Sequence, residues 1–241
     1  MQASKIIREA MTRVAALRQV AGNQPTLAQA VLDVKHLQAQ RFATTYADLL
    51  DSPAYAPSAR FFLEELYSAR DYSLRDQQFA RIASALEFTF PDHVVAMAVA
   101  LAQLHGMTEE LDLAMAQAWL QYQAEPAAKR YVAAWQHVGR PADRDWQLAT
   151  VLNIGEKLTE LTRKRSLRVM LKMMRKPAKL AGLDSLQAFF ETGFDRFASM
   201  ACQGGTATVF LDTVKSRETA WIFQLFHSPD NAGITEVFGT Q

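Results

Sequence analysis

This sequence has little cysteine, glycine and proline, and each scarcity excludes a class of protein. Its 241 residues include a single cysteine, Cys202, so one chain can form neither a disulfide nor a cysteine-rich zinc site. Ten glycines and eight prolines are too few for a loop-rich β-sandwich or barrel. A reduced compartment fits this composition, and we expect Cys202 to be a buried, unreactive thiol.

Long hydrophobic runs are also missing. The longest, Val94–Ala102, is far shorter than the roughly 20 residues that cross a bilayer. Met1–Asn23 alternates charged and apolar residues, without the continuous hydrophobic segment of a secretion signal. We therefore expect a cytoplasmic protein with no membrane span.

The usual signatures of catalysis and cofactor binding do not occur. There is no Gly-x-Gly-x-x-Gly, no P-loop, no Gly-x-Ser-x-Gly, no His-Glu-x-x-His and no Glu-x-x-His. We accordingly expect no metal and no cofactor, and favour a protein that is not an enzyme. One alternative is a helical protein that binds haem or another apolar ligand in its core, near His93 or His105.

What the sequence does contain is apolar residues at helical spacing along most of its length, with no strand-like alternation. Good helix formers such as Ala, Leu, Gln, Arg and Met are plentiful. The pattern predicts an all-α, multi-helix bundle of about eight to ten helices, more than about 65% helical, with no significant sheet. The expected helices are 4–21, 26–50, 57–69, 74–90, 91–104, 108–122, 126–135, 141–161 with a continuation over 163–175, 185–200 and 206–226.

We expect one helical domain over residues 1–241, with 1–122 and 126–228 as candidate subdomains. Residues 229–241 resemble a loosely ordered tail. The helix that starts near Pro91 is apolar nearly all round, which predicts a central position in the core. Gly106 is expected to interrupt it.

The stretch Arg60–Ile82 combines an aromatic helix, a polar turn and the start of a second helix. Phe62 and Leu66 fall on one apolar helical face, so we expect both to be buried. Ser73 stands three residues before Asp76, a spacing that predicts a capping box with Ser73 as the N-cap.

A second interpretation of this stretch is a catalytic site. Four carboxylates, if brought together in a cleft, would make the protein an enzyme; they are Glu64, Glu65, Asp71 and Asp76. We favour helix caps and local ion pairs, because no histidine lies in the stretch to complete a metal or acid–base set.

Two blocks of sequence identify a family resemblance. The first is the Phe61–Tyr67 helix, Phe-Phe-Leu-Glu-Glu-Leu-Tyr, followed by Asp71 and an Arg-Asp pair. The second is Met174–Ala178, Met-Arg-Lys-Pro-Ala, followed by Ala-Gly-Leu, Leu-Gln and Phe-Phe pairs through Phe190. With these blocks the chain resembles a family of uncharacterised proteobacterial proteins. The resemblance implies no established activity, and no functional residue follows from it.

Charge is distributed unevenly along the chain. Residues 1–125 carry a net charge of −4 and residues 126–241 a net charge of +5. Nine basic residues and one acidic residue lie in Lys157–Lys179. Within it, apolar residues at i, i+3, i+4 and i+7 are expected to face the interior of a basic amphipathic helix; they are Leu167, Met170, Leu171 and Met174.

The opposite side of that helix is expected to form an exposed basic strip, made of Arg165, Arg168, Lys172, Arg175 and Lys176. Such a strip attracts anionic partners. The sequence therefore favours an interaction or regulatory protein of otherwise unknown function. The partner can be the acidic half of a second copy, giving a homodimer, or another acidic protein. Nucleic acid has weaker support, because no DNA-binding motif is present.

Overall fold

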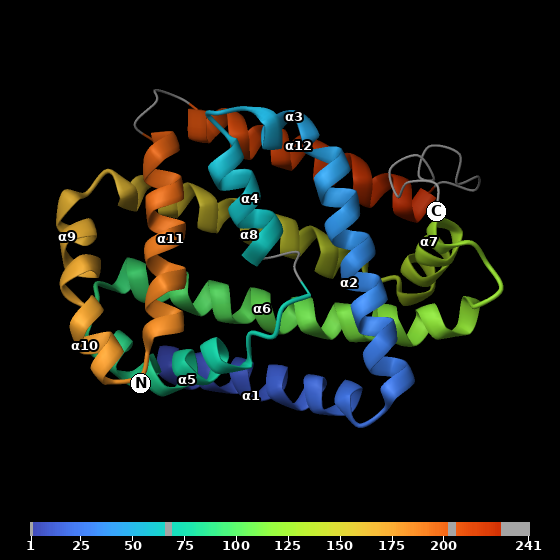
Figure 1. Cartoon of the computed structure of the whole chain (residues 1–241), viewed down its shortest axis with the longest axis horizontal. Coiled ribbons are helices and arrows are strands. Elements are labelled where there is room, and N and C mark those ends of the chain that lie inside the picture. Colours follow the sequence, from blue (N-terminus) through green and yellow to red (C-terminus); the bar gives the residue numbers. More distant parts are fainter. Residues whose placement is uncertain (1, 66–68, 202–205, 228–241) are drawn as a thin grey trace. The chain divides into compact units, whose positions relative to one another are not determined.

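The computed structural model describes residues 2–65, 69–201 and 206–227, and within these ranges it is helical without strands (Figure 1). Helix accounts for 89% of the described residues, which confirms the all-α prediction. The α-helices are α1 (Gln2–Gly22), α2 (Pro25–Thr45), α3 (Ala47–Asp51), α4 (Ala56–Glu65), α5 (Ser73–Thr89), α6 (Asp92–Trp119), α7 (Ala127–Val138), α8 (Pro141–Thr162), α9 (Arg165–Met173), α10 (Arg175–Leu180), α11 (Asp184–Ala201) and α12 (Thr206–His227). A 3₁₀ turn, η1 (Leu120–Tyr122), follows α6. The expected tail and Cys202 lie outside the described residues.

The predicted interruption at Gly106 is wrong, because α6 continues through it to Trp119. A glycine inside a helix costs only about 0.5–1 kcal/mol relative to alanine. Gly106 is buried, and a Cβ at this position would make only an ordinary contact, 3.9 Å from the Cβ of Ala10 on α1. The propensity cost of one glycine is therefore too small to end this long helix.

The chain forms two compact units, each assembled from three separate stretches. Unit 1 consists of Met1–Ala15, Arg70–Gly106 and Thr150–Leu211. Unit 2 consists of Ala16–Ala69, Met107–Ala149 and Asp212–Gln241. Helices α1, α6, α8 and α12 each contribute residues to both units.

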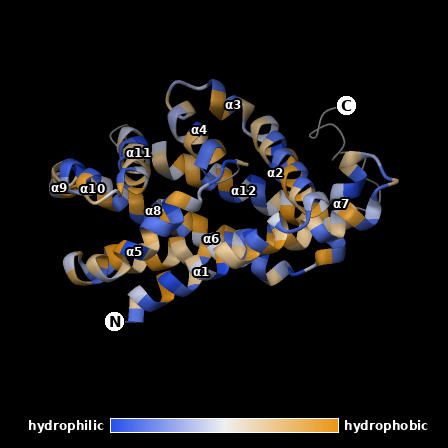
Figure 2. Cartoon of the chain, turned by 60° about the horizontal axis from the view of Figure 1, so that its bottom comes forward, coloured by the Kyte–Doolittle hydropathy of each residue, from blue (hydrophilic) through white to orange (hydrophobic). Residues whose placement is uncertain are grey.

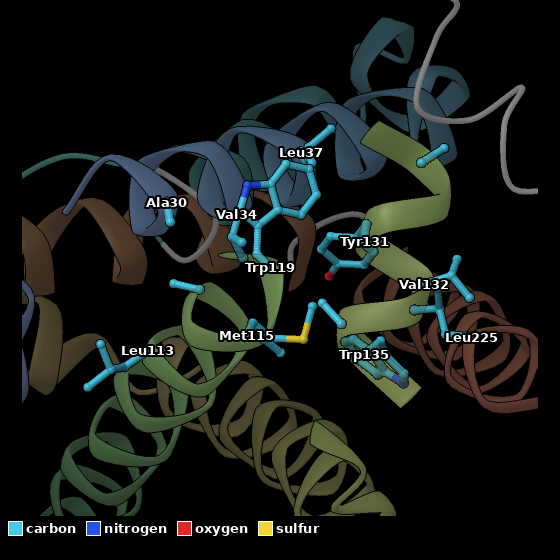
Figure 3. Close-up of a cluster of buried hydrophobic side chains, with 14 of the residues drawn as sticks. Ala30, Val34, Leu37, Leu113, Met115, Trp119, Tyr131, Val132, Trp135 and Leu225 are labelled. Carbon is cyan, nitrogen blue, oxygen red and sulfur yellow. The ribbon is translucent and has the colours of Figure 1, made fainter. Parts of the chain in front are cut away.

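The core of unit 2 is built from α2, α6, α7 and α12 around two large aromatic residues. Trp119 and Tyr131 are nearly fully buried, and Figure 3 shows both rings among aliphatic side chains. Trp135 continues the cluster, 6.2 Å from the ring of Tyr131 and 5.6 Å from that of Phe226. Aromatic burial of this kind supplies much of the hydrophobic stabilisation of a small core.

The core of unit 1 joins α1, α5, α6 and α11. Its buried members come from four separate regions of sequence: Ile7, Met11, Val14, Phe79, Ala83, Leu86, Val95, Ala98, Ala102 and Leu186. Phe79 on α5 meets Phe190 on α11 edge to face, with ring centroids 6.2 Å apart. Gln78 adds a polar tie, since its side-chain carbonyl accepts a hydrogen bond from the backbone N–H of Leu186 at 2.9 Å. The start of α11 is thereby fixed against α5.

Phe62 is buried on α4, as predicted, whereas Leu66 lies outside the described residues. The predicted capping role of Ser73 is wrong. Ser73 is the first residue of α5, and its backbone N–H donates to the Asp71 carboxylate at 2.9 Å. The Ser73 hydroxyl donates to the same oxygen at 2.6 Å. Asp71 therefore binds the first backbone N–H of α5, and the N-cap residue, Tyr72, makes no side-chain hydrogen bond to the helix.

We predict that removing the Asp71 side chain destabilises the protein more than removing the Ser73 hydroxyl. Asp71→Ala should lower the free energy of unfolding by about 0.5–2 kcal/mol, because both hydrogen bonds from Ser73, at the first residue of α5, are lost. Ser73→Ala should cost less, because its backbone N–H still donates to Asp71. Urea unfolding of the two variants measures the difference. A larger loss for Ser73→Ala would contradict the assignment.

Candidate functional site: a basic surface on α9 and α10

The basic segment is not the single helix that the sequence predicts. Helix α8 ends at Thr162, α9 starts after Lys164 in an extended conformation, and α10 starts at Arg175. Pro177 explains the second break. A proline in the interior of a helix removes a backbone hydrogen bond and clashes with the preceding turn, whereas one in the first turn is tolerated. Starting a new helix at Arg175 places Pro177 in a first turn.

The predicted inner face of the segment is present, though less deeply buried than expected. Leu167, Met170, Leu171 and Met174 are half-buried, and Ala178 on α10 is fully buried. Helices α9 and α10 both pack on α11, which in turn packs on α5 (Figure 1). The inner face thus attaches the two short helices to the rest of unit 1.

Ion pairs to α11 add to this attachment. Arg168 Nη2 lies 3.0 Å from Asp195 Oδ1, and Arg175 Nε lies 2.8 Å from both oxygens of Glu191. The hydrogen bond from Arg175 is the main reason that the pKa of Glu191 is lowered. Gln187 donates to the same carboxylate at 3.1 Å and to the backbone carbonyl of Leu171 at 2.7 Å. Arg168 therefore ties α9 to α11, and Arg175 ties the start of α10 to α11.

The C-terminus of α10 is equally well defined. Gly182 adopts the left-handed conformation, with φ of 62°, and the backbone N–H of Leu183 donates to the carbonyl of Ala178 at 2.8 Å. This is the Schellman arrangement that ends many helices at glycine. Arg81 on α5 donates to the carbonyls of Ala181 and Gly182. The surface that α9 and α10 present is accordingly held at both ends.

Lysines form the remaining positive charge of this surface. Lys172, Lys176 and Lys179 are exposed, and in the described part of the chain no carboxylate lies within salt-bridge distance of their ammonium groups. Of the predicted basic strip, Arg168 and Arg175 are exposed but paired with α11, and the side chain of Arg165 is not described. The charge available to a partner is therefore carried mainly by lysine.

The same surface carries exposed apolar side chains that sequence reasoning missed. Val169, Met173 and Leu180 are 55%, 73% and 90% exposed. Figure 2 shows hydrophobic and hydrophilic residues side by side along α9 and α10. We define the α9–α10 surface as Val169, Lys172, Met173, Lys176, Lys179 and Leu180. A signal was available: the segment has more apolar residues than one helical face can bury.

The four carboxylates of the enzyme hypothesis do not assemble within either unit. Glu64 and Glu65 belong to unit 2, where Glu64 is exposed, while Asp71 and Asp76 belong to unit 1. Asp71 binds the first turn of α5, as described above. Asp76 is buried and lies 2.9 Å from His105 Nε2 in a hydrogen bond, with Arg75 Nε at 3.9 Å. Asp71 thus binds a neighbour in sequence, whereas Asp76 binds His105 of α6, a histidine from outside the stretch.

The two histidines considered as haem ligands are placed unfavourably for that role. His93 is exposed on the first turn of α6 rather than in the core. His105 is half-buried, but its Nε2 is engaged by Asp76. That nitrogen is therefore committed to a hydrogen bond rather than to a metal ion.

A network of buried charges in unit 2 was not predicted. Lys35 on α2 lies between two carboxylates of α6, with its ammonium nitrogen 3.0 Å from Glu109 and 3.7 Å from Asp112. Arg18 also reaches Glu109 at 3.0 Å, and Gln38 donates to Asp112 at 3.1 Å. Burial raises the pKa of Asp112 despite the opposing effect of Lys35. Burial alone would lower the pKa of Lys35, but Asp112 and Glu109 together raise it.

A second buried pair in unit 2 joins α2 to α12. Arg41 Nη1 lies 2.8 Å from Glu218 Oε1, and the Tyr46 hydroxyl donates to the same oxygen at 2.9 Å. The Arg41 guanidinium also lies 5.8 Å from the centre of the Trp221 ring. Buried charges need partners of this kind, and we interpret both groups as structural.

No group of three or more His, Cys, Asp or Glu residues among the described residues is arranged to hold a metal ion. Nor does any helix in those residues have the length and hydropathy needed to cross a bilayer.

Comparison with known proteins gives one family match. The model of a domain of unknown function, DUF8198, matches residues 17–232. No curated protein and no solved structure matches the chain.

Proposed function

This chain belongs to the DUF8198 family, a family of unknown function, and from that premise we propose that it acts by binding rather than by catalysis. Its α9–α10 surface is the proposed binding site, and the partner is anionic. The observation that carries the proposal is the set of exposed lysines at residues 172, 176 and 179, which have no carboxylate in salt-bridge reach among the described residues.

The arrangement of the neighbouring arginines supports this proposal. Arg168 and Arg175 already pair with Asp195 and Glu191, so α9 and α10 are tied to α11 without a salt bridge from the lysines. Lys172 adds only a longer-range attraction to Glu191, whose pKa it helps to lower. Like charges close together on a surface repel one another, at a small cost that anchoring does not require. An anionic partner relieves that repulsion and releases bound counterions.

The proposal predicts salt-dependent binding that the lysines control. The triple variant Lys172→Gln/Lys176→Gln/Lys179→Gln should bind anionic probes at least tenfold more weakly than the native protein at low salt. Fluorescence anisotropy with labelled poly-glutamate and labelled RNA, together with sedimentation of anionic vesicles, covers the chemical classes of partner. Raising the salt from about 0.05 to 0.2 M should weaken the native interaction, because screening grows with ionic strength.

Arginine variants are unsuitable for this test, since Arg168→Gln or Arg175→Gln also releases a carboxylate of α11. A matched control removes charge elsewhere: Lys129→Gln/Lys215→Gln changes two exposed lysines of α7 and α12. Sedimentation velocity at both salt concentrations tests the remaining partner, the acidic half of a second copy. If no probe binds and no salt-sensitive dimer forms, the proposal is wrong.

A further inference from the structure

The α9–α10 surface has a composition that identifies its partner more closely, and this step rests on the proposed function. We propose that it binds the surface of a bilayer that contains anionic phospholipid, with the lysines at the headgroup phosphates and the apolar side chains inserted among the upper acyl chains. The protein would then be a peripheral membrane-binding protein.

The positions of the residues support insertion from one side. Within α9, Val169, Lys172 and Met173 follow one another at i, i+3 and i+4, and within α10 Lys176 and Leu180 stand at i and i+4. Each of the two helices therefore carries its lysine and apolar residues along one side. Their apolar members are more than half exposed, although α9 and α10 already bury a separate set of apolar side chains. The outer apolar residues are therefore not needed for attachment to unit 1.

The mixture of side chains favours lipid over nucleic acid. A phosphodiester backbone offers no apolar surface for Met173 or Leu180, and proteins that bind single strands use aromatic side chains to stack on bases. Residues 163–182 contain no aromatic side chain. A bilayer interface instead offers phosphates and hydrocarbon within a few ångströms of each other.

The same mixture favours lipid over a folded acidic protein. Protein interfaces are enriched in aromatic residues, Met and Arg and depleted in Lys, so the three exposed lysines count against such an interface and only Met173 fits it. Within α9 and α10, the two arginines whose side chains are described are bound to α11, and the exposed residues include lysine, methionine, valine and leucine. Lysine suits a diffuse anionic surface, because its long stem lies along apolar groups while the ammonium reaches the phosphates.

The test measures how much of the full-length chain co-sediments with lipid vesicles. One set of vesicles is phosphatidylcholine alone, and the other contains 30% phosphatidylserine. We expect binding only to the anionic vesicles. Each lysine near such a surface strengthens binding by about fivefold, so Lys172→Gln/Lys176→Gln should weaken it roughly thirtyfold. Lys129→Gln/Lys215→Gln, which removes the same charge from α7 and α12, should leave it nearly unchanged.

A second pair of variants tests insertion. Met173→Ser/Leu180→Ser should weaken vesicle binding roughly tenfold, since apolar area buried in the bilayer contributes to affinity. Phe88→Ser, at a residue of α5 that is 78% exposed, is the matched control and should have little effect. Circular dichroism of every variant should match the native protein, because all of these side chains are exposed.

The experiments distinguish binding to lipid from the more general binding of an anionic partner on which it rests. If poly-glutamate or RNA binds through the lysines while anionic vesicles do not, the lipid inference is wrong and the proposed function stands. If Met173→Ser/Leu180→Ser binds vesicles as tightly as the native protein, insertion is wrong as well. If no anionic probe binds at low salt and no salt-sensitive dimer forms, both proposals fail.

Discussion

Replacing Glu218 with Gln should lower the free energy of unfolding by about 3–5 kcal/mol, the usual cost of breaking a buried ion pair by removing one partner. The Glu218 carboxylate accepts hydrogen bonds from Arg41 at 2.8 Å and from the Tyr46 hydroxyl at 2.9 Å. Glutamine has nearly the same shape, so the loss reports the charge that faces Arg41 rather than a cavity. Urea unfolding near pH 7 measures the change.

The neighbouring residue of α12 provides a matched control. Arg217 makes a bidentate pair with Asp48, at 2.6 and 2.8 Å, but the Asp48 side chain is 57% exposed. Asp48→Asn should therefore cost at most about 1 kcal/mol, as exposed pairs usually do. Equal losses for Glu218→Gln and Asp48→Asn would show that burial does not set the cost.

A double replacement tests whether the pair itself is favourable. Arg41→Met/Glu218→Leu removes both charges together and should be much less destabilising than Glu218→Gln alone, because apolar residues can replace a buried pair at little cost. A double variant as unstable as Glu218→Gln would indicate that Tyr46 or Trp221 depends on the charges for its position.

The all-α fold could be predicted because apolar periodicity is a local property of the sequence. The same rule failed where two local preferences competed. Gly106 signals a helix end by its propensity, yet α6 has buried residues on both sides of it, and packing of those residues outweighs the small cost of one glycine. At α5, the spacing of Ser73 and Asp76 suits a capping box, yet the helix starts one residue earlier than that box requires, with Tyr72 as the N-cap residue.

The buried ion pair left a signal in the sequence that periodicity can detect. On α2 the buried positions are Leu27, Ala30, Val34 and Leu37, and Arg41 is the next residue at the same spacing. On α12, Glu218 stands between Val214 and Trp221 in the same way. A charged residue in an apolar stripe needs a partner of opposite charge. Helical spacing does not specify that the apolar face of α2 packs against that of α12, because this is a tertiary contact.

The candidate site was predicted only in part, for a related reason. Composition identified the basic segment, and the exposure of Lys172 and Lys176 followed from helical spacing. The sequence does not specify that Asp195 and Glu191, some 16 to 27 residues further along the chain, engage two of the arginines. Nor does it specify which apolar residues remain in water once the inner face is packed.

Replacing Lys35 with Met should be the other strongly destabilising change in unit 2, by about 3–5 kcal/mol near pH 8. Lys35 is the cation that faces both Glu109 and Asp112, at 3.0 and 3.7 Å. Without it, two buried carboxylates on adjacent turns of α6 repel each other. Adding Asp112→Asn to Lys35→Met should recover part of the loss, since one of the repelling charges is then absent.

The loss of stability caused by Lys35→Met should also depend on pH, because the two carboxylates that Lys35 faces titrate. Burial already raises the pKa of Asp112, and Lys35 opposes that rise, so its removal raises the pKa further. A carboxyl group whose pKa is higher in the folded state than in the unfolded state binds more protons when folded. Its contribution to stability is then largest below its unfolded pKa of about 3.9 and declines as the pH rises through its folded pKa.

The deficit of Lys35→Met relative to the native protein should accordingly be larger at pH 8 than at pH 5.5. Lys35 does not itself titrate in this window, because its pKa is raised from 10.5. Lys157→Met is the control, since Lys157 pairs with Glu160 at 3.2 Å and both side chains are at least half exposed. Its small effect should be the same at both pH values. A deficit for Lys35→Met that is equal at pH 5.5 and 8 would mean that Arg18 or Arg144 compensates the two carboxylates without Lys35.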